Sequence, residues 1–274
     1  MSISNGKIGM RKCFDGLTTV NVELTSRCNK KCWMCGRRKI ERDYPELMDW
    51  GDMPFELVER IAEQLPLHIM VQLHNNGEPT LYPRLEEAIA LFDKQIKHFD
   101  TNGKLIVEKA DAIIDRLDTM TISVIQDDPE GDEQYALVQQ FLDLRGNHKP
   151  FLIYRCLGNV DLERYKKLPG VIATRILHSP MGSYKYEKHP TVPEAGICLD
   201  LLGHLVIDRY GKVSPCVRFD PKRLGVIGDA AKTPLVDIWN GKERRTWLDA
   251  HIKGRRDTIP LCSYCEFWGV PTGY

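Results

Sequence analysis

The stretch Leu24-Thr-Ser-Arg-Cys-Asn-Lys-Lys-Cys-Trp-Met-Cys-Gly-Arg-Arg38 holds three cysteines, Cys28, Cys32 and Cys35, with the spacing C-x3-C-x2-C. Three thiols on so short a segment converge on one point, but a structural zinc site requires four ligands. An iron–sulfur cube held by three cysteines keeps one iron open for a further ligand. The alternatives are half of a zinc site completed from elsewhere, or buried thiols that pack as small hydrophobic side chains.

The residues around these cysteines are basic, which is not typical of buried thiols. A positive surround lowers the pKa of a thiol and balances the charge of a sulfur-rich anionic cluster. The sequence therefore favours a metal cluster over packed thiols. The basic residues are Arg27, Lys30, Lys31, Arg37 and Arg38.

The composition excludes some classes of partner. The chain has 274 residues, with 38 Lys and Arg balanced by 38 Asp and Glu. No field of one sign points to nucleic acid or to an anionic membrane, and no apolar stretch approaches a membrane span. The N-terminus has no apolar core of a signal peptide, so we expect a cytoplasmic protein. In that compartment nine cysteines indicate metal binding rather than disulfides.

Strand-like and helix-like segments alternate through the first two thirds of the chain, which predicts parallel strands joined by crossover helices. The cysteine segment follows the first strand, at the end of the sheet where active sites of such folds lie. We expect strands at residues 18–24, 68–74, 96–100, 119–125, 150–157 and 171–177, and helices at 54–65, 85–94, 107–117, 133–145 and 162–168.

A domain boundary is expected between Ser179 and Gly196, where prolines and glycines end the periodic pattern. We therefore predict a first domain of residues 1–190 and a second of residues 191–274. The second contains an expected hairpin at 203–216, helices at 235–239 and 244–253, and a final Cys-x2-Cys.

The spacing of the first cysteines, with Met34 just before the last one, resembles the signature of the radical S-adenosylmethionine (SAM) enzymes. This resemblance implies an α/β fold, a partial (β/α)6 TIM-like barrel. It also implies a [4Fe-4S] cluster on Cys28, Cys32 and Cys35, whose open iron takes the amino and carboxylate groups of SAM.

Two strand ends resemble SAM-binding motifs of that family. In His74-Asn-Asn-Gly-Glu-Pro79, Gly77 would let the backbone approach SAM and Glu78 would accept a hydrogen bond from its ammonium group. Thr101-Asn-Gly103 resembles the family's turn at the end of the third strand, with Asn102 at its centre. Ordinary turns are the alternative in both places.

Residues on the next strands are further candidates. Ser123 resembles a frequent ribose contact, and Arg155 resembles a basic residue near the SAM carboxylate. Cys156 follows Arg155 on one strand, so only one of the two points inward. We expect Cys156 to be a buried, inert thiol rather than a hydrogen-atom donor. The acidic segment Gln126-Asp-Asp-Pro129 is expected to be a solvated loop, with a grip on substrate as the alternative.

Four further cysteines, Cys198, Cys216, Cys262 and Cys265, lie in the last third of the chain. Zinc would fit four thiolates in isolation. The segments around them, such as Gly211-Lys-Val-Ser-Pro-Cys216 and Pro260-Leu-Cys-Ser-Tyr-Cys265, resemble the SPASM module of radical SAM enzymes in its shortened "twitch" form. This resemblance implies one auxiliary [4Fe-4S] cluster with closed coordination.

Together these resemblances imply an oxidoreductase that uses two [4Fe-4S] clusters and SAM, with a flavodoxin- or ferredoxin-type electron donor. The cysteine layout is similar to that of aminocyclitol dehydrogenases, so the expected reaction is the two-electron oxidation of a small sugar- or cyclitol-like molecule. One alternative is radical modification of a ribosomally made peptide. The other is a non-enzymatic, metal-stabilised binding or redox-sensing protein.

Overall fold

The centre of the molecule is a nine-stranded sheet with the strand order β6-β5-β4-β3-β2-β1-β7-β8-β9. The computed structural model describes residues 12–175, 177, 197–217, 220–263 and 265. The strands are β1 (Thr19–Val22), β2 (Met70–Gln72), β3 (Ile96–Thr101), β4 (Thr119–Ile125), β5 (Phe151–Leu157), β6 (Val171–Arg175), β7 (His204–Ile207), β8 (Lys212–Ser214) and β9 (Gly228–Asp229).

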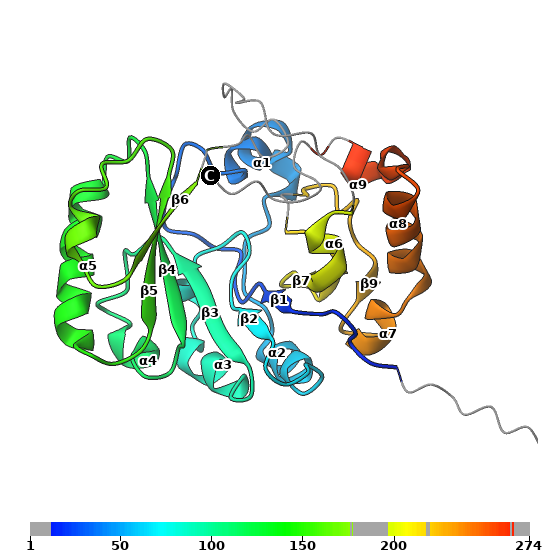
Figure 1. Ribbon diagram of the computed structural model, residues 1–274, viewed down its shortest axis with the longest axis horizontal. Helices are drawn as coiled ribbons and strands as arrows, with labels where there is room; N and C mark the ends of the chain where they lie inside the picture. The colour runs from blue at the N-terminus through cyan, green and yellow to red at the C-terminus, as the bar shows by residue number, and fades with distance from the viewer. Residues whose placement is uncertain (1–11, 176, 178–196, 218–219, 264, 266–274) are drawn as a thin grey trace, which may run out of the picture.

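Helices join the parallel strands and line the outer side of the curved sheet (Figure 1), where α2 to α5 lie side by side. The other helices belong to the cysteine regions and to the C-terminal part. The helices are α1 (Arg37–Asp43), α2 (Phe55–Ala62), α3 (Leu85–Leu91), α4 (Ala110–Ile113), α5 (Gly131–Arg145), α6 (Leu199–Gly203), α7 (Leu235–Trp239), α8 (Lys242–Ile252) and α9 (Pro260–Ser263).

The pairing of the strands confirms the predicted α/β fold and extends it. Strands β1 to β6 are all parallel to their neighbours. The predicted hairpin is present as β7 and β8, and β7 also pairs in parallel with the free edge of β1. One sheet therefore runs across the predicted domain boundary, and the division at residue 190 stays a prediction.

Local patterns misjudged three helical segments. The helix expected at 107–117 is shortened to α4, and the one at 162–168 is a single 3-10 turn, Tyr165–Lys167. Helix α1 was not predicted, because its sequence Arg-Arg-Lys-Ile-Glu-Arg-Asp has one apolar residue and no amphipathic period. Among the described helices, none is long and apolar enough to cross a membrane.

The two faces of the sheet differ in polarity because side chains alternate along each strand. One face is apolar, and its side chains pack with those of α2 to α5 in one hydrophobic core. Fully buried residues on this face include Val20, Val71, Phe99, Met120 and Tyr154. Burying this much apolar surface contributes roughly 25 cal/mol per Å² and holds the helices on the sheet.

The opposite face carries polar side chains on each of the strands β1 to β5, and we call it the inner face. Its positions alternate with the core residues, so each strand offers polar side chains there. They include Asn21 on β1, Gln72 on β2, His98 on β3, Thr121 on β4 and Arg155 on β5. A sheet with one apolar and one polar face positions functional groups on the polar one.

Candidate functional site

The first cysteine loop leaves the carboxyl end of β1 and enters α1. Its turns are closed by backbone hydrogen bonds, from Cys35 N to Cys32 O at 3.2 Å and from Arg38 N to Cys35 O at 3.0 Å. The thiols of Cys28, Cys32 and Cys35 are all free and partly buried. Met34 is half-buried on the same loop.

The charges around this loop differ from the sequence-based expectation. Burial raises the pKa of the Cys32 thiol to about 12, with further contributions from Cys35 and Cys28 and only partial relief from Lys30. Burial raises the pKa of Cys35 as well. The cations do lower these pKa values, as expected, but they do not bring them below the usual range of a thiol. The reason is that burial outweighs the cations, several of which are bound to carboxylates.

Three of the cations around the cysteine loop form ion pairs with carboxylates. Arg27 donates to Asp52 through Nε at 3.0 Å, and Arg38 pairs with Glu41 at 2.7 Å. Lys30 pairs with Asp128, and the side chains of both are nearly buried, with exposed fractions of 4% and 6%. The segment 126–129 was expected to be a solvated loop, which is wrong for Asp128.

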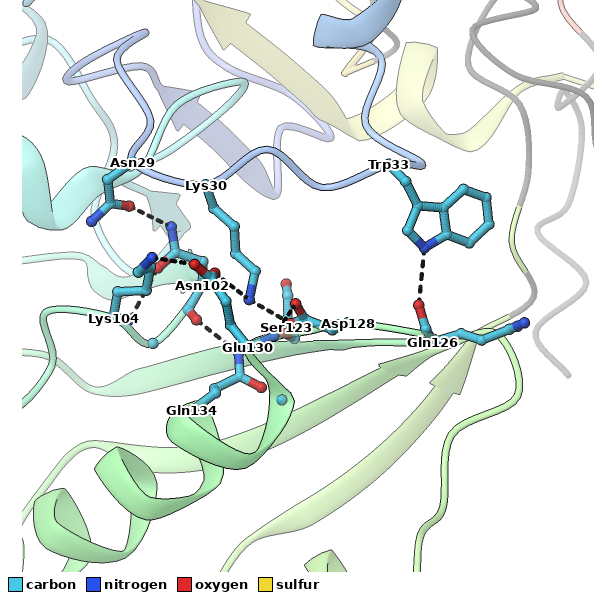
Figure 2. A network of polar contacts seen from close by, with 12 residues as sticks. Asn29, Lys30, Trp33, Asn102, Lys104, Ser123, Gln126, Asp128, Glu130 and Gln134 are labelled. Atoms are coloured by element: carbon cyan, nitrogen blue, oxygen red, sulfur yellow. Dashed lines mark hydrogen bonds and ion pairs between the residues drawn. The ribbon is translucent and has the colours of Figure 1, made fainter.

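Figure 2 shows how these contacts tie the cysteine loop to the β4–α5 connection. Besides the Lys30–Asp128 pair, Trp33 Nε1 donates to the carbonyl of Gln126 at 2.9 Å. Glu130 lies 3.5 Å from Lys30 and also pairs with Lys104 at 2.7 Å. The cysteine loop is therefore fixed at two points to an element nearly a hundred residues away in sequence.

Gly77 lies in the loop after β2, at the point where this loop contacts the start of the first cysteine loop. A Cβ atom at this position would lie 2.0 Å from Thr25 O and 2.8 Å from Arg27 O. Glu78 N donates to Arg27 O at 2.7 Å, which fixes the contact. The need for glycine therefore comes from the cysteine loop itself, and approach to a ligand is not required to explain it.

Glu78 is buried, and its carboxylate accepts hydrogen bonds from other residues of the chain. Oε1 accepts hydrogen bonds from Thr80 Oγ1 at 2.7 Å and from Thr101 Oγ1 at 2.8 Å, and Oε2 accepts one from Asn102 N at 2.7 Å. Burial raises the pKa of this carboxyl, against the effect of these donors. These bonds give Glu78 a structural task, joining two strand ends, and its contact with the ammonium group of SAM stays a prediction.

Asn102 links the end of β3 to the cysteine loop. Its Nδ2 donates to Asn29 Oδ1 at 2.8 Å and lies 3.9 Å from Cys28 Sγ. Gln134 Nε2 donates to its carbonyl at 2.7 Å and to that of Ser123 at 2.9 Å. The structure thus brings Asn102 beside the first thiols, as the sequence predicted, while its contact with SAM stays a prediction.

A polar cluster on the inner face was missed by sequence reasoning. We call it the inner-face cluster, and it consists of His74, His98, Asp100 and Arg155. Asp100 accepts from His74 Nε2 at 3.3 Å and from His98 Nε2 at 3.0 Å, and it pairs with Arg155. Burial by itself raises the pKa of Asp100, but His74, His98 and Arg155 together hold it well below its usual range.

The histidines of this cluster are fixed in orientation. Asp100 N donates to His74 Nδ1 at 3.0 Å, so the ring proton of His74 sits on Nε2. Ser123 lies opposite Arg155 in the β4–β5 register and on the same face. The missed signal was the alternation within β3, where His98 and Asp100 flank the core residue Phe99.

Arg155 and Cys156 point to opposite faces, as predicted. Cys156 is fully buried in the hydrophobic core, and burial raises the pKa of its thiol. It lies on the helix-covered side of the sheet, away from the inner face. The predicted inert thiol agrees with this placement.

The second cysteine group assembles around α6, α8 and α9. The charges of Cys265 and Cys198 add to burial in raising the pKa of Cys262 to about 12, so these thiols lie near one another. Arg256 Nη1 donates to Cys262 O at 2.6 Å and to Cys265 O at 3.2 Å. Cys216 follows β8, where its N–H donates to Ser214 Oγ at 3.2 Å.

No cysteine of either group forms a disulfide in the part of the chain that the structure describes. Among the described residues, no three His, Cys, Asp or Glu side chains are placed to hold a metal ion. The fit of a cluster is therefore judged from the donors. Three thiols share one loop in the first group. In the second group, Cys198 and Cys265 lie close enough to Cys262 to raise the pKa of its thiol. Clustered thiols are the ligands that iron–sulfur clusters use.

Comparison with known proteins agrees with this arrangement. Residues 22–159 match the radical SAM superfamily, and residues 198–266 match SPASM, an iron–sulfur cluster-binding domain. The first match spans half of the chain, so the chain belongs to the radical SAM superfamily. Membership implies a [4Fe-4S] cluster and SAM, and the second match implies further iron–sulfur binding.

Relatives cover nearly the whole chain. The S-adenosyl-L-methionine-dependent 2-deoxy-scyllo-inosamine dehydrogenase of Niallia circulans is 24% identical over 261 residues, 92% of this chain and 94% of the relative. BtrN in complex with AdoMet and 2-DOIA has a TM-score of 0.64 at 17% identity, covering 94% of this chain and 97% of that one.

Streptococcus suis SuiB bound to the precursor peptide SuiA has a TM-score of 0.60 at 16% identity, covering 83% of this chain and 65% of that one. At these identities the likeness to both solved structures shows the fold.

Proposed function

We propose that this radical SAM enzyme oxidises a secondary alcohol of a small sugar- or cyclitol-like molecule. The observation that carries the proposal is the occurrence, in one chain, of a three-thiol loop at the end of β1 and a second group of thiols beside α8. The first group leaves a cluster open for SAM, and the second provides a place for the electron that an oxidation releases.

When bound, the open cluster and SAM supply a 5′-deoxyadenosyl radical that removes a hydrogen atom from a C–H bond, and the auxiliary cluster accepts an electron. The chain positions these groups. Cys28, Cys32 and Cys35 hold the first cluster, and Cys198, Cys216, Cys262 and Cys265 hold the second. Gly77 and Asn102 lie beside the first cysteine loop, and together with Met34 on that loop they form the proposed contact surface for SAM.

The inner-face cluster is the proposed surface for the substrate. Both oxygens of Asp100 already accept hydrogen bonds, so the cluster offers mainly N–H groups of Arg155, with the Ser123 hydroxyl beside them. Groups of this kind bind hydroxyl and carbonyl oxygens. In this proposal Arg155 and Ser123 contact the substrate or SAM, and Asp100 fixes the Arg155 guanidinium.

The relative from Niallia circulans supports a cyclitol as the first substrate to test, since its name is that of a 2-deoxy-scyllo-inosamine dehydrogenase. The reaction removes one hydrogen atom from carbon, then one proton and one electron, and leaves a ketone. An external one-electron donor of the flavodoxin or ferredoxin class is the proposed source of the electron that starts the cycle.

The test is anaerobic reconstitution, with iron and sulfide counted, followed by SAM, dithionite and 2-deoxy-scyllo-inosamine. We expect about eight irons per chain, formation of 5′-deoxyadenosine, and a ketone product lighter than the substrate by a hydrogen molecule. Cys13→Ala is a matched control, because Cys13 is an exposed thiol outside both groups. Absence of 5′-deoxyadenosine would overturn the proposal.

Radical modification of a peptide is the second candidate, favoured by the likeness in fold to SuiB bound to its precursor peptide. The same assay separates the two. If cyclitols and sugars leave the rate of SAM cleavage unchanged while short candidate precursor peptides raise it, the peptide function replaces the first proposal.

A further inference from the structure

The segment formed by α8 and the turn after it is basic in a chain that is neutral as a whole. Residues 242–256 contain six Lys and Arg against two Asp and Glu, whereas the full chain has 38 of each kind. The backbone of Cys198 and Cys262, two members of the second cysteine group, is hydrogen-bonded to this segment. The basic residues of this segment are therefore close to the second cysteine group.

Helix α8 has one buried and one exposed side. Arg244 and His251 point inward and are buried. Lys242, Arg245 and Lys253 are exposed and follow each other at spacings of three and eight residues, which places them on one side of a helix. Arg255 is exposed just beyond the helix end, and Ile252 is the most exposed large apolar side chain in the described part of the chain, at 65%.

We call Lys242, Arg245, Ile252, Lys253 and Arg255 the basic face. Within the described ranges, none of its four cations forms an ion pair. The acid Asp249 lies on the same side, and the face keeps a net positive charge. Unpaired cations around an exposed apolar side chain are typical of a surface that binds an acidic partner by charge complementarity.

The inner side of the same segment contacts the backbone of the second cysteine group. Cys198 N donates to His251 Nδ1 at 3.4 Å, and Arg256 donates to the carbonyls of Cys262 and Cys265. A helix is about 10 Å thick with its side chains, so only one helix separates the basic face from the backbone of Cys198. Figure 1 shows α8 at the rim of the molecule, on the side opposite α5.

We propose that the basic face is the docking surface for an acidic one-electron carrier protein of the flavodoxin or ferredoxin class. At this surface one electron passes from the reduced auxiliary cluster to the oxidised carrier, so the cluster is oxidised and the carrier is reduced by one electron. The proposal rests on the proposed function, because it requires a redox-active cluster on the second thiol group.

The test is charge reversal in the reconstituted enzyme, with Lys242, Arg245 and Lys253 each changed to Glu. The matched control reverses three exposed lysines far from α8, Lys94, Lys166 and Lys167. The probe is an oxidised flavodoxin, mixed by stopped flow with dithionite-reduced enzyme freed of excess reductant. Repeating the experiment in a Cys28→Ala background restricts the electrons to the auxiliary cluster.

We expect electron transfer to flavodoxin to fall by about tenfold or more in the basic-face variant and to stay unchanged in the control. The wild-type rate should also fall as salt is added. Equal rates in both variants, or a rate that does not respond to salt, would overturn the docking surface.

An assay with dithionite as the reductant distinguishes failure of the docking proposal from failure of the proposed function. It is a small reagent that needs no docking surface, so both variants should cleave SAM with dithionite at the wild-type rate. If the wild-type enzyme itself cleaves no SAM with dithionite, the proposed function fails. If it does, and flavodoxin still reacts equally with all three proteins, only the docking proposal fails.

Discussion

The two cysteine regions differ in how they use their charges. Around the first loop, Arg27, Lys30 and Arg38 are each bound to a carboxylate, and the Lys30–Asp128 pair is buried. Around the second group, the cations of the basic face have no such partner among the described residues and face solvent. The comparison indicates that charge near the first site serves to position the loop, whereas charge near the second is available to a partner.

The largest expected effect comes from removing one cysteine from each region and comparing the loss of activity. Cys28→Ala should abolish formation of 5′-deoxyadenosine and lower the iron content from about eight to about four per chain, because only the first cluster is lost. Cys262→Ala should lower the iron content similarly but leave slow SAM cleavage in place. Iron analysis and chromatography of the nucleoside products measure both. Loss of all iron in either variant would show that the regions depend on each other.

A second comparison tests the paired and the unpaired charges. Asp128→Asn leaves Lys30 buried with only the more distant Glu130, and breaking a buried ion pair costs about 3–5 kcal/mol. Lys242→Gln removes an exposed cation without an ion pair and should change stability by less than about 0.5 kcal/mol. Denaturant unfolding of the reconstituted proteins measures both. Similar values for the two variants would contradict the comparison.

Gly77→Ala tests the contact between the first cysteine loop and the loop after β2. The added Cβ would lie 2.0 Å from Thr25 O, so the two loops must separate. Overpacking of this kind costs about 1–3 kcal/mol, and we expect slower SAM cleavage. Gly131→Ala is the control, because its Cβ would meet no atom closer than 3.5 Å. Equal activity of the two variants would remove the structural reason for glycine at position 77.

The smallest expected effect is a pH dependence on the inner face. The folded-state pKa of Asp100 is held below the unfolded value of about 3.9. Its ionised form therefore stabilises the fold above about pH 4, and this contribution is lost as the pH falls through the folded-state pKa. The difference in unfolding free energy between wild type and Asp100→Asn should be constant from about pH 6 to 8 and shrink below about pH 4. A difference that stays unchanged below about pH 4 would contradict this contribution of Asp100.

The sequence predicted the features that depend on local pattern. The parallel strands with their crossover helices and the opposite orientation of Arg155 and Cys156 follow from patterns of residues close together in the chain. The bounds of β4 and α7 match the predicted ones. Asn102 was placed correctly near the first loop because it follows directly from the end of a strand.

Contacts between distant residues could not be predicted in the same way. The partner of Lys30 lies 98 positions away, and a partner of Glu78 lies 23 positions away. Whether a charged residue faces solvent or a buried partner depends on which loops meet at one end of the sheet, and no local periodicity records that. The same holds for His74 and Asp100, whose pairing joins the ends of two strands.

The parallel pairing of β7 with β1 has a consequence for how the chain folds. Thr19 faces His204 in this register, so one edge of β1 stays bare until residues far along the chain have been made. Contacts of such high sequence separation form slowly, and an exposed strand edge attracts other chains. During synthesis the first strand must wait until the chain has been made as far as β7, which ends at Ile207 of 274 residues. A chain cut before β7 would therefore be prone to aggregate, even with all six preceding strands intact.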